Sequence, residues 1–72
     1  MTRVLNCREL QCPMPIVRLA MAVKELIAGE MIVVEATDPA FETDVRAWVE
    51  MTGNRLEGFE PGDIQRATIR VG

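Results

Sequence analysis

Histidine is absent from this 72-residue chain, and its absence excludes several kinds of active site. Without histidine there is no imidazole for acid–base catalysis, no cysteine–histidine nucleophile pair and no ligand set for most zinc sites. A glycine-rich phosphate loop is also missing, so ATP has no binding motif here. A chain this short buries only roughly 60% of the surface exposed by its unfolded form. We therefore expect one domain over residues 1–72, with its chemistry at the surface.

Long apolar runs and basic clusters are missing as well. No run approaches the ~18 apolar residues of a membrane span, and polar residues between Arg3 and Glu9 interrupt the first apolar stretch. The net charge is −3 and the eight lysines and arginines are dispersed, which argues against direct nucleic-acid binding. Two cysteines do not make a secreted disulfide framework. We expect a cytoplasmic monomer without a signal peptide, a membrane partner or a nucleic-acid partner.

Hydrophobic periodicity predicts six elements in the order β-α-β-α-β-β. Strands are predicted over residues 3–6, 31–37, 56–60 and 64–71, the second with Ile32, Val34 and Ala36 facing inward. A first helix is predicted from residue 13 or 15 to residue 27, and a second follows Asp38 and ends at Gly53.

The element order predicts an α+β fold. Each of the first two crossovers contains a helix, and right-handed crossovers place both helices on one side of the sheet. The last two strands form a hairpin around a Pro-Gly-Asp turn. The expected architecture is a two-layer βαβαββ sandwich with a four-stranded mixed sheet and two helices on one face.

Cys12 stands where the first helix is expected to begin. Pro13 favours an extended Cys12, as in an N-cap residue, and Pro15 removes another early N–H group. The free N–H groups of Met14 and Ile16 and the helix dipole are then expected to face the sulfur and to lower its pKa. A buried, inert cysteine is the competing interpretation, which the proline-flanked position disfavours.

Two motifs resemble those of the TusA/SirA-like sulfurtransferase family. Residues 5–15, Leu-Asn-Cys-Arg-Glu-Leu-Gln-Cys-Pro-Met-Pro, are similar to the family's N-terminal signature with its Cys-Pro-x-Pro motif. Asp38, Pro39 and Ala40 match the family's Asp-Pro-Ala turn before the second helix. The resemblance covers essentially the whole chain, and the two motifs together are more specific than either alone.

The resemblance implies a cofactor-independent sulfurtransferase that carries sulfane sulfur as a persulfide on Cys12. Its implied partners are transient: cysteine desulfurases or rhodanese-like proteins as donors, and DsrE-like proteins or other sulfurtransferases as acceptors. tRNA thiolation, cofactor synthesis and sulfur oxidation are the implied downstream uses. Glu9 departs from the family, which often has glycine at this position, and it places an extra negative charge near the thiol.

Several residues keep two interpretations. Cys7 is either a small apolar strand end or a second thiol that resolves the persulfide as a disulfide. Arg8 either supports an anion at Cys12 or is a solvated loop residue, and Asp38 is expected to cap the second helix rather than act as a catalytic acid. Two thiols without histidine make no metal site.

The competing functions are a two-thiol redox or thiosulfate-handling protein using Cys7 and Cys12, and a non-catalytic binding module. The module's architecture resembles the C-terminal domain of bacterial translation initiation factor three.

Overall fold

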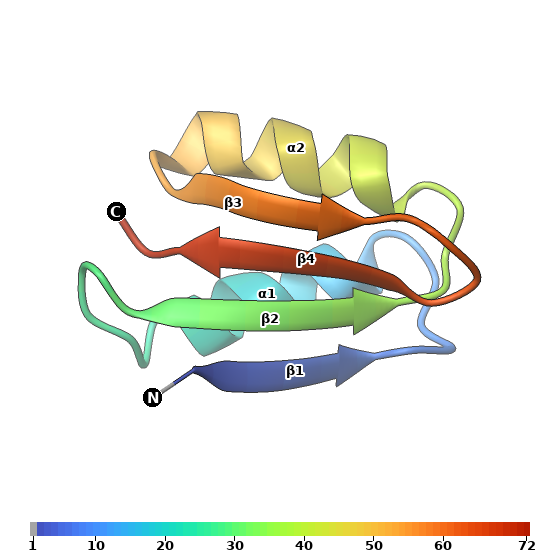
Figure 1. Cartoon of the computed structure of the whole chain (residues 1–72), viewed down its shortest axis with the longest axis horizontal. Helices are drawn as coiled ribbons and strands as arrows, with labels where there is room; N and C mark the ends of the chain where they lie inside the picture. The colour runs from blue at the N-terminus through green and yellow to red at the C-terminus, as the bar shows by residue number, and fades with distance from the viewer. Residues whose placement is uncertain (1) are drawn as a thin grey trace.

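The mixed sheet predicted from the sequence is present in the computed structural model, which describes residues 2–72. In chain order the elements are β1 (Arg3–Cys7), α1 (Met14–Val23), β2 (Met31–Ala36), α2 (Phe41–Thr52), β3 (Arg55–Glu60) and β4 (Gln65–Arg70). The strand order is β1-β2-β4-β3 (Figure 1). β1 pairs with β2 in parallel, whereas β2–β4 and β4–β3 are antiparallel. Strand β4 therefore lies between β2 and β3, and the β-α-β-α-β-β order and α+β class are confirmed.

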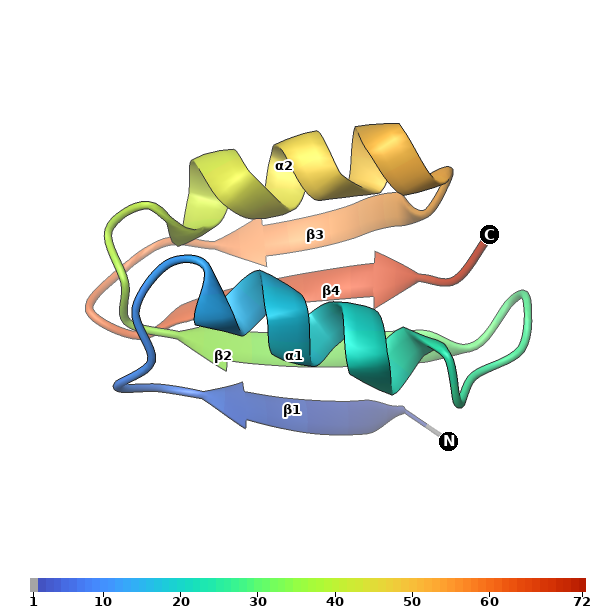
Figure 2. The same cartoon turned by 180° about the vertical axis from the view of Figure 1, so that it is seen from behind.

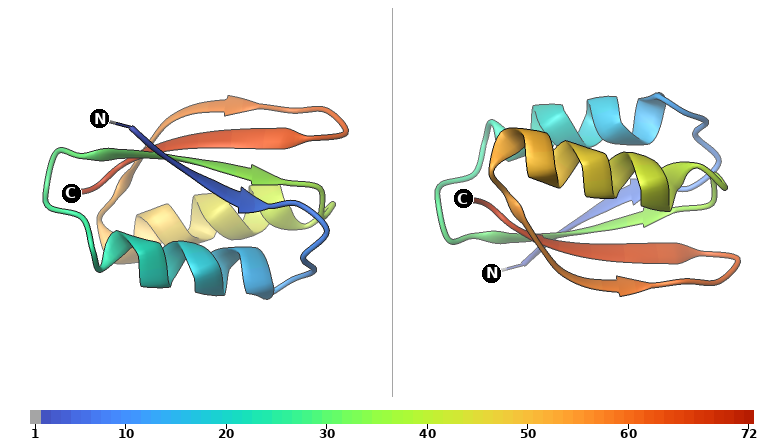
Figure 3. Two further views of the ribbon diagram at one scale, coloured as in Figure 1. Left: turned by 90° about the horizontal axis from the view of Figure 1, so that it is seen from below. Right: turned by 90° about the horizontal axis from the view of Figure 1, so that it is seen from above.

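Both helices cover the same face of the sheet, which gives the expected two layers (Figures 2 and 3). Alternation in β2 sends Ile32, Val34 and Ala36 toward the helices, and all three are fully buried, as predicted. The largest buried side chain is Phe41, at the first position of α2, whose ring lies 6.2 Å from that of Phe59 on β3. The core therefore fixes the start of α2 against the sheet.

Helix α1 is shorter than the periodicity predicts, since it ends at Val23 rather than near Ile27. The N–H groups of Glu25 and Leu26 bond to carbonyls three residues back, at 3.1 and 3.0 Å, so the chain tightens into turns. Leu26 still packs against the core, but Ile27 is 73% exposed. The apolar spacing continues past the end of the helix because the turn keeps the Leu26 side chain on the core. Periodicity alone does not distinguish such a turn from a further turn of helix.

Helix α2 ends as predicted but begins differently. Gly53 takes the left-handed conformation after the last turn, with φ of 78°, and its N–H bonds to the carbonyl of Val49 at 3.1 Å. The N-cap is Ala40, which has no side-chain capping bond, so the prediction that Asp38 caps this helix is wrong. The Asp38 carboxylate instead accepts a hydrogen bond from the backbone N–H of Cys12.

The other face of the sheet carries paired charges. Arg66 on β4 bonds to Glu35 on β2 at 3.0 Å and lies 3.4 Å from Glu60 on β3, while Arg70 bonds to Glu57 at 2.9 Å. Exposed pairs of this kind contribute little to stability, about 0–1 kcal/mol each. Among residues 2–72, no helix is long and apolar enough to cross a membrane.

Candidate functional site

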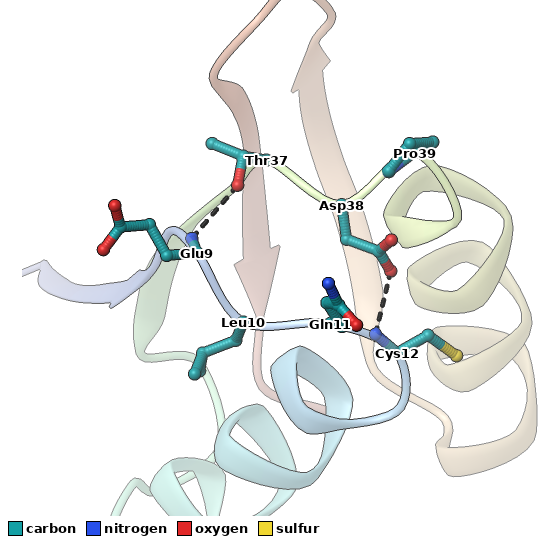
Figure 4. A pocket seen from close by; sticks show the side chains of 7 residues that line it. All are labelled: Glu9, Leu10, Gln11, Cys12, Thr37, Asp38 and Pro39. Atoms are coloured by element: carbon teal, nitrogen blue, oxygen red, sulfur yellow. Dashed lines mark hydrogen bonds between the residues drawn. The ribbon is translucent and has the colours of Figure 1, made fainter.

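Cys12 lies where two loops meet at one end of the sheet. Because β1 and β2 run in parallel, the loops that follow them leave from the same edge (Figure 1). Two hydrogen bonds join these loops: the Cys12 N–H donates to Asp38 Oδ2 at 3.1 Å, and the Glu9 N–H donates to Thr37 Oγ1 at 3.0 Å (Figure 4). The backbone of Cys12 is thus fixed while its side chain stays exposed.

The start of α1 does not supply free N–H groups to the Cys12 sulfur, contrary to the prediction. Pro13, not Cys12, is the N-cap residue. The Met14 N–H donates to the Gln11 carbonyl at 2.8 Å, and the Ile16 N–H donates to the Pro13 carbonyl at 3.1 Å. The loop itself therefore uses the donors that were expected to stabilise a thiolate.

Two carboxylates flank the sulfur instead. The Cys12 Sγ and carboxylate oxygens of Asp38 and Asp44 all lie within 4.8 Å of one another. The pKa of the Cys12 thiol is raised, first by its hydrogen bond to Asp44, then by partial desolvation and by the negative charges of Asp44 and Asp38. Each effect favours the protonated thiol. The predicted lowering of the pKa is wrong, because the expected helix-end donors are occupied and acids from another segment approach the sulfur.

Cys12 lies on the boundary between two surface hollows of different character. A hollow of mixed polar and apolar lining, about 360 Å³ in volume, is lined by Glu9, Leu10, Gln11, Cys12, Thr37, Asp38 and Pro39 (Figure 4). An apolar groove of about 340 Å³ is lined by Cys12, Pro13, Ile16, Asp44, Ala47, Trp48 and Met51. The sulfur is directed toward α2, the helix that forms one wall of this groove (Figure 4). A molecule seated in either hollow reaches the thiol.

The remaining residues of the Cys-Pro-x-Pro segment divide between surface and core. Pro15 is fully buried, whereas Met14 is 40% exposed. Arg8 does not line either hollow beside Cys12. Its side chain donates to Asn6 Oδ1 at 3.1 Å and lies 3.8 Å from Glu35, on the charged face of the sheet. The structure therefore does not bring Arg8 to the thiol.

Cys7 is fully buried and Cys12 is exposed, so the two free cysteines face different environments. The Cys7 Sγ donates a weak hydrogen bond to the Pro15 carbonyl at 3.9 Å. Burial raises the pKa of the Cys7 thiol, an effect that the charge of Arg18 partly offsets. The interpretation of Cys7 as a small residue that ends a strand and points inward agrees with this placement.

In residues 2–72, Cys12, Asp38 and Asp44 are also the one group whose donor atoms are close enough to share a metal ion. Structural zinc sites in proteins use four thiolate or imidazole ligands, and this group offers a single thiol. We therefore assign no metal to it.

Sequence reasoning missed Asp44, Trp48 and Met51. Together with Ala47 they follow the spacing i, i+3, i+4, i+7, so they form a stripe along one side of α2. That stripe lies beside the core stripe of Phe41, Val45 and Val49. The spacing was available in the sequence, but nothing local indicates that this side of α2 faces the loop of Cys12.

Glu9 adopts a left-handed backbone conformation, with φ of 70°. A non-glycine residue is strained there by about 1–2 kcal/mol, which explains why glycine suits this position. After the entropy that glycine loses on folding, we expect Glu9→Gly to raise the free energy of unfolding by about 0.5–1 kcal/mol in urea titrations. Glu9→Ala removes the same charge without relieving the strain, and equal stability of the two variants would contradict this explanation.

Comparison with known proteins gives one consistent family. The model of the family described as "Sulfurtransferase TusA" matches residues 3–71. YrkI of Bacillus subtilis is 41% identical over 97% of this chain and 95% of its own length. YrkF of the same organism is 42% identical over 99% of this chain, which spans only 39% of YrkF. The sulfur carrier protein TusA of Allochromatium vinosum is 37% identical over 81% of this chain and 78% of its own length.

A solved structure has the same fold. The SirA-like protein of Desulfitobacterium hafniense superposes with a TM-score of 0.83 over 100% of this chain and 99% of its own, at 23% identity. At that identity the likeness supports the fold alone, and it agrees with the mixed sheet and its two helices described above.

Proposed function

The chain belongs to the TusA sulfurtransferase family of sulfur carriers, and from this premise we propose that Cys12 carries sulfane sulfur as a persulfide and relays it between proteins. The observation that carries the proposal is the placement of the two thiols. Cys12 is exposed and lines both hollows, whereas Cys7 is buried in the core. A relay needs an accessible thiol more than an enclosed pocket, which suits a chain of this size.

The proposed transfer balances without an external oxidant. The Cys12 thiolate attacks the outer sulfur of a donor persulfide, R–S–SH. A bond forms between the Cys12 sulfur and that outer sulfur, and the donor S–S bond breaks. The donor leaves as the thiolate R–S⁻, so its inner sulfur is reduced while the Cys12 sulfur is oxidised, and the outer sulfur keeps its oxidation state. Discharge to an acceptor thiolate is the same reaction in the opposite direction.

The Cys-Pro-x-Pro segment presents the thiol in this proposal. Pro15 is a buried residue in the first turn of α1, so it holds the segment against the core, while the exposed side chain of Met14 is available to a partner. Asp38, in the loop with Pro39 and Ala40, holds the backbone of Cys12. The function of the segment is therefore rigid presentation of one sulfur.

The proposed partners are proteins that approach from the exposed side of Cys12. The donors are cysteine desulfurases or rhodanese-like proteins, and the acceptors are DsrE-like proteins or other sulfurtransferases. Their setting is the cytoplasm, with tRNA thiolation, cofactor synthesis or sulfur oxidation downstream.

The test is a single-turnover relay. The chain is loaded by a cysteine desulfurase with cysteine, or by a rhodanese with thiosulfate. It is then separated from the donor and mixed with a DsrE-like acceptor. The proposal expects intact-mass spectra to show one sulfur atom leaving the carrier as one appears on the acceptor. A chain that never gains sulfur from either donor would contradict it.

A two-thiol mechanism is the competing function, and Cys7→Ser separates the two. Because Cys7 is buried and bonded to the Pro15 carbonyl, we expect Cys7→Ser to keep persulfide loading and transfer close to those of the wild-type protein. The measurement is single-turnover transfer together with non-reducing mass spectrometry of the oxidised protein. A large loss of transfer, or a dominant Cys7–Cys12 disulfide in the wild-type protein, would favour the two-thiol mechanism instead.

A further inference from the structure

All ionisable side chains that line the two hollows beside the Cys12 thiol are acids. Glu9 comes from the β1–α1 loop, Asp38 from the β2–α2 loop and Asp44 from α2, while α1 contributes the uncharged Ile16. No lysine or arginine of residues 2–72 lines either hollow. Two of these acids, Asp38 and Asp44, place carboxylate oxygens within 4.8 Å of the sulfur, so an exposed thiol that must become an anion to react lies beside two negative charges.

Asp44 differs from the other two acids in its relation to the sulfur. The Asp38 carboxylate accepts a hydrogen bond from the backbone N–H of Cys12, and the Glu9 carboxylate points away from Cys12 (Figure 4). Asp44 instead lies beside the sulfur itself: one of its carboxylate oxygens is within 4.8 Å of the Cys12 Sγ, and both residues line the apolar groove. It lies one turn into α2, between Phe41 and Val45, two residues that are fully buried. The carboxylate is thus held at the sulfur by a helix that the core fixes in place.

We propose that Asp44 is a charge gate on Cys12: its carboxylate holds the thiol proton in the free carrier, and a cationic side chain of a docked protein releases it. This proposal rests on the proposed function of Cys12 as the sulfur-bearing thiol. When a lysine or arginine pairs with Asp44, the carboxylate no longer favours the protonated thiol. The proton then passes to water, which leaves the thiolate to attack the donor sulfur. Asp44 is a positioning residue, since it acts through Cys12.

The apolar groove indicates what kind of partner brings that cation. Ile16, Trp48 and Met51 line the groove beside Asp44, and the Met51 side chain is 86% exposed. A protein that seats an apolar side chain there removes water from the Asp44 carboxylate, which strengthens its attraction to a neighbouring cation. The expected partner surface therefore has a basic residue beside an apolar one.

The gate also selects among sulfur donors. Small dianions such as thiosulfate meet like charge at both hollows, and a like charge close to a reacting anion raises the cost of approach. A persulfide held on a protein with a basic surface avoids that cost. We therefore expect the carrier to take sulfur from proteins in preference to free thiosulfate, which argues against direct thiosulfate handling.

Alkylation of Cys12 by two reagents of different charge tests the gate without any partner protein. Iodoacetamide is neutral and reports the thiolate fraction, whereas iodoacetate is an anion and also reports the local charge. Asp44→Asn keeps the shape and removes the charge. We expect it to speed iodoacetamide alkylation at neutral pH by about two- to fivefold, given the strength of exposed charge pairs. The increase should be larger with iodoacetate.

Glu50→Gln is the matched control, because Glu50 lies on the same helix, carries the same charge, is exposed and does not line the groove. Its rates should equal those of the wild-type protein. In urea all three proteins should react alike, which shows that the difference belongs to the folded site. Equal rates for Asp44→Asn and Glu50→Gln in the folded state would overturn the gate.

A second measurement uses the wild-type protein alone, so it does not depend on the folding of a variant. Added salt screens exposed charges. Raising the ionic strength should therefore speed iodoacetate alkylation more than iodoacetamide alkylation, and a salt-independent ratio of the two rates would contradict the gate.

Sulfur loading separates this proposal from the proposed function. A chain that loads normally but fails both alkylation tests keeps the carrier function and loses the gate. A chain that passes them but never loads loses the carrier function.

Discussion

Replacing Cys12 with serine is expected to abolish sulfur loading. The serine hydroxyl is not ionised at neutral pH and does not form a persulfide. Within residues 2–72, the two hollows contain no other thiol that could replace that of Cys12. Cys7 is the only other cysteine, and it is fully buried in the core. After incubation with a cysteine desulfurase and cysteine, intact-mass spectra of the wild-type protein should show an added sulfur atom, and those of Cys12→Ser should show none.

The serine variant is a clean test because Cys12 is exposed and its structural bond is made by the backbone. The N–H of residue 12 donates to Asp38 in either protein, so we expect the loop and the stability to be preserved. Circular dichroism and urea unfolding of both proteins check that expectation. Loading of a folded Cys12→Ser protein to the wild-type level would show that Cys12 is not the sulfur-bearing residue.

Phe41→Ala is expected to lower the free energy of unfolding by about 3–5 kcal/mol, the usual cost of removing a buried phenylalanine. Phe41 is fully buried at the start of α2, and its ring packs 6.2 Å from that of Phe59. A domain of this length has a total stability of only about 4–11 kcal/mol, so this one change removes a large part of it. Urea unfolding monitored by the fluorescence of Trp48 provides the measurement.

Met51→Ala is the control for the stability prediction, since it truncates a large apolar side chain on the same helix that is 86% exposed. We expect it to change the free energy of unfolding by no more than about 0.5 kcal/mol. If Phe41→Ala were as mild as Met51→Ala, the core would not depend on the start of α2. The fixed placement of Asp44 beside Cys12 would then have no structural basis.

The inward face of β2 was predictable because alternation records which side of a strand is buried. β4 shows the same alternation, since Ala67 and Ile69 are fully buried and alternate with Arg66, Thr68 and Arg70. The helical crossover also predicted the parallel pairing of β1 and β2. The end of α1 was not predictable in the same way, because Leu26 packs on the core from a turn and continues the helical spacing beyond the helix.

The site was predictable only as far as its local sequence extends. The prolines around Cys12 correctly indicated an exposed thiol at the start of a helix. The direction of its pKa shift was predicted wrongly, because the responsible carboxylates come from distant segments. Asp38 is 26 residues away in sequence and lies in the next loop. Asp44 lies further still, and only the packing of α2 beside α1 places it at the sulfur.

The most direct test of the central claim is to locate the sulfur in the loaded wild-type protein. After loading by a cysteine desulfurase, the exposed thiols and persulfides are alkylated, and the chain is digested between Cys7 and Cys12 so that each cysteine lies on its own peptide. The account predicts that peptide mass spectra show the added sulfur on the Cys12 peptide and none on the Cys7 peptide. Sulfur on the Cys7 peptide, or on neither, would contradict it.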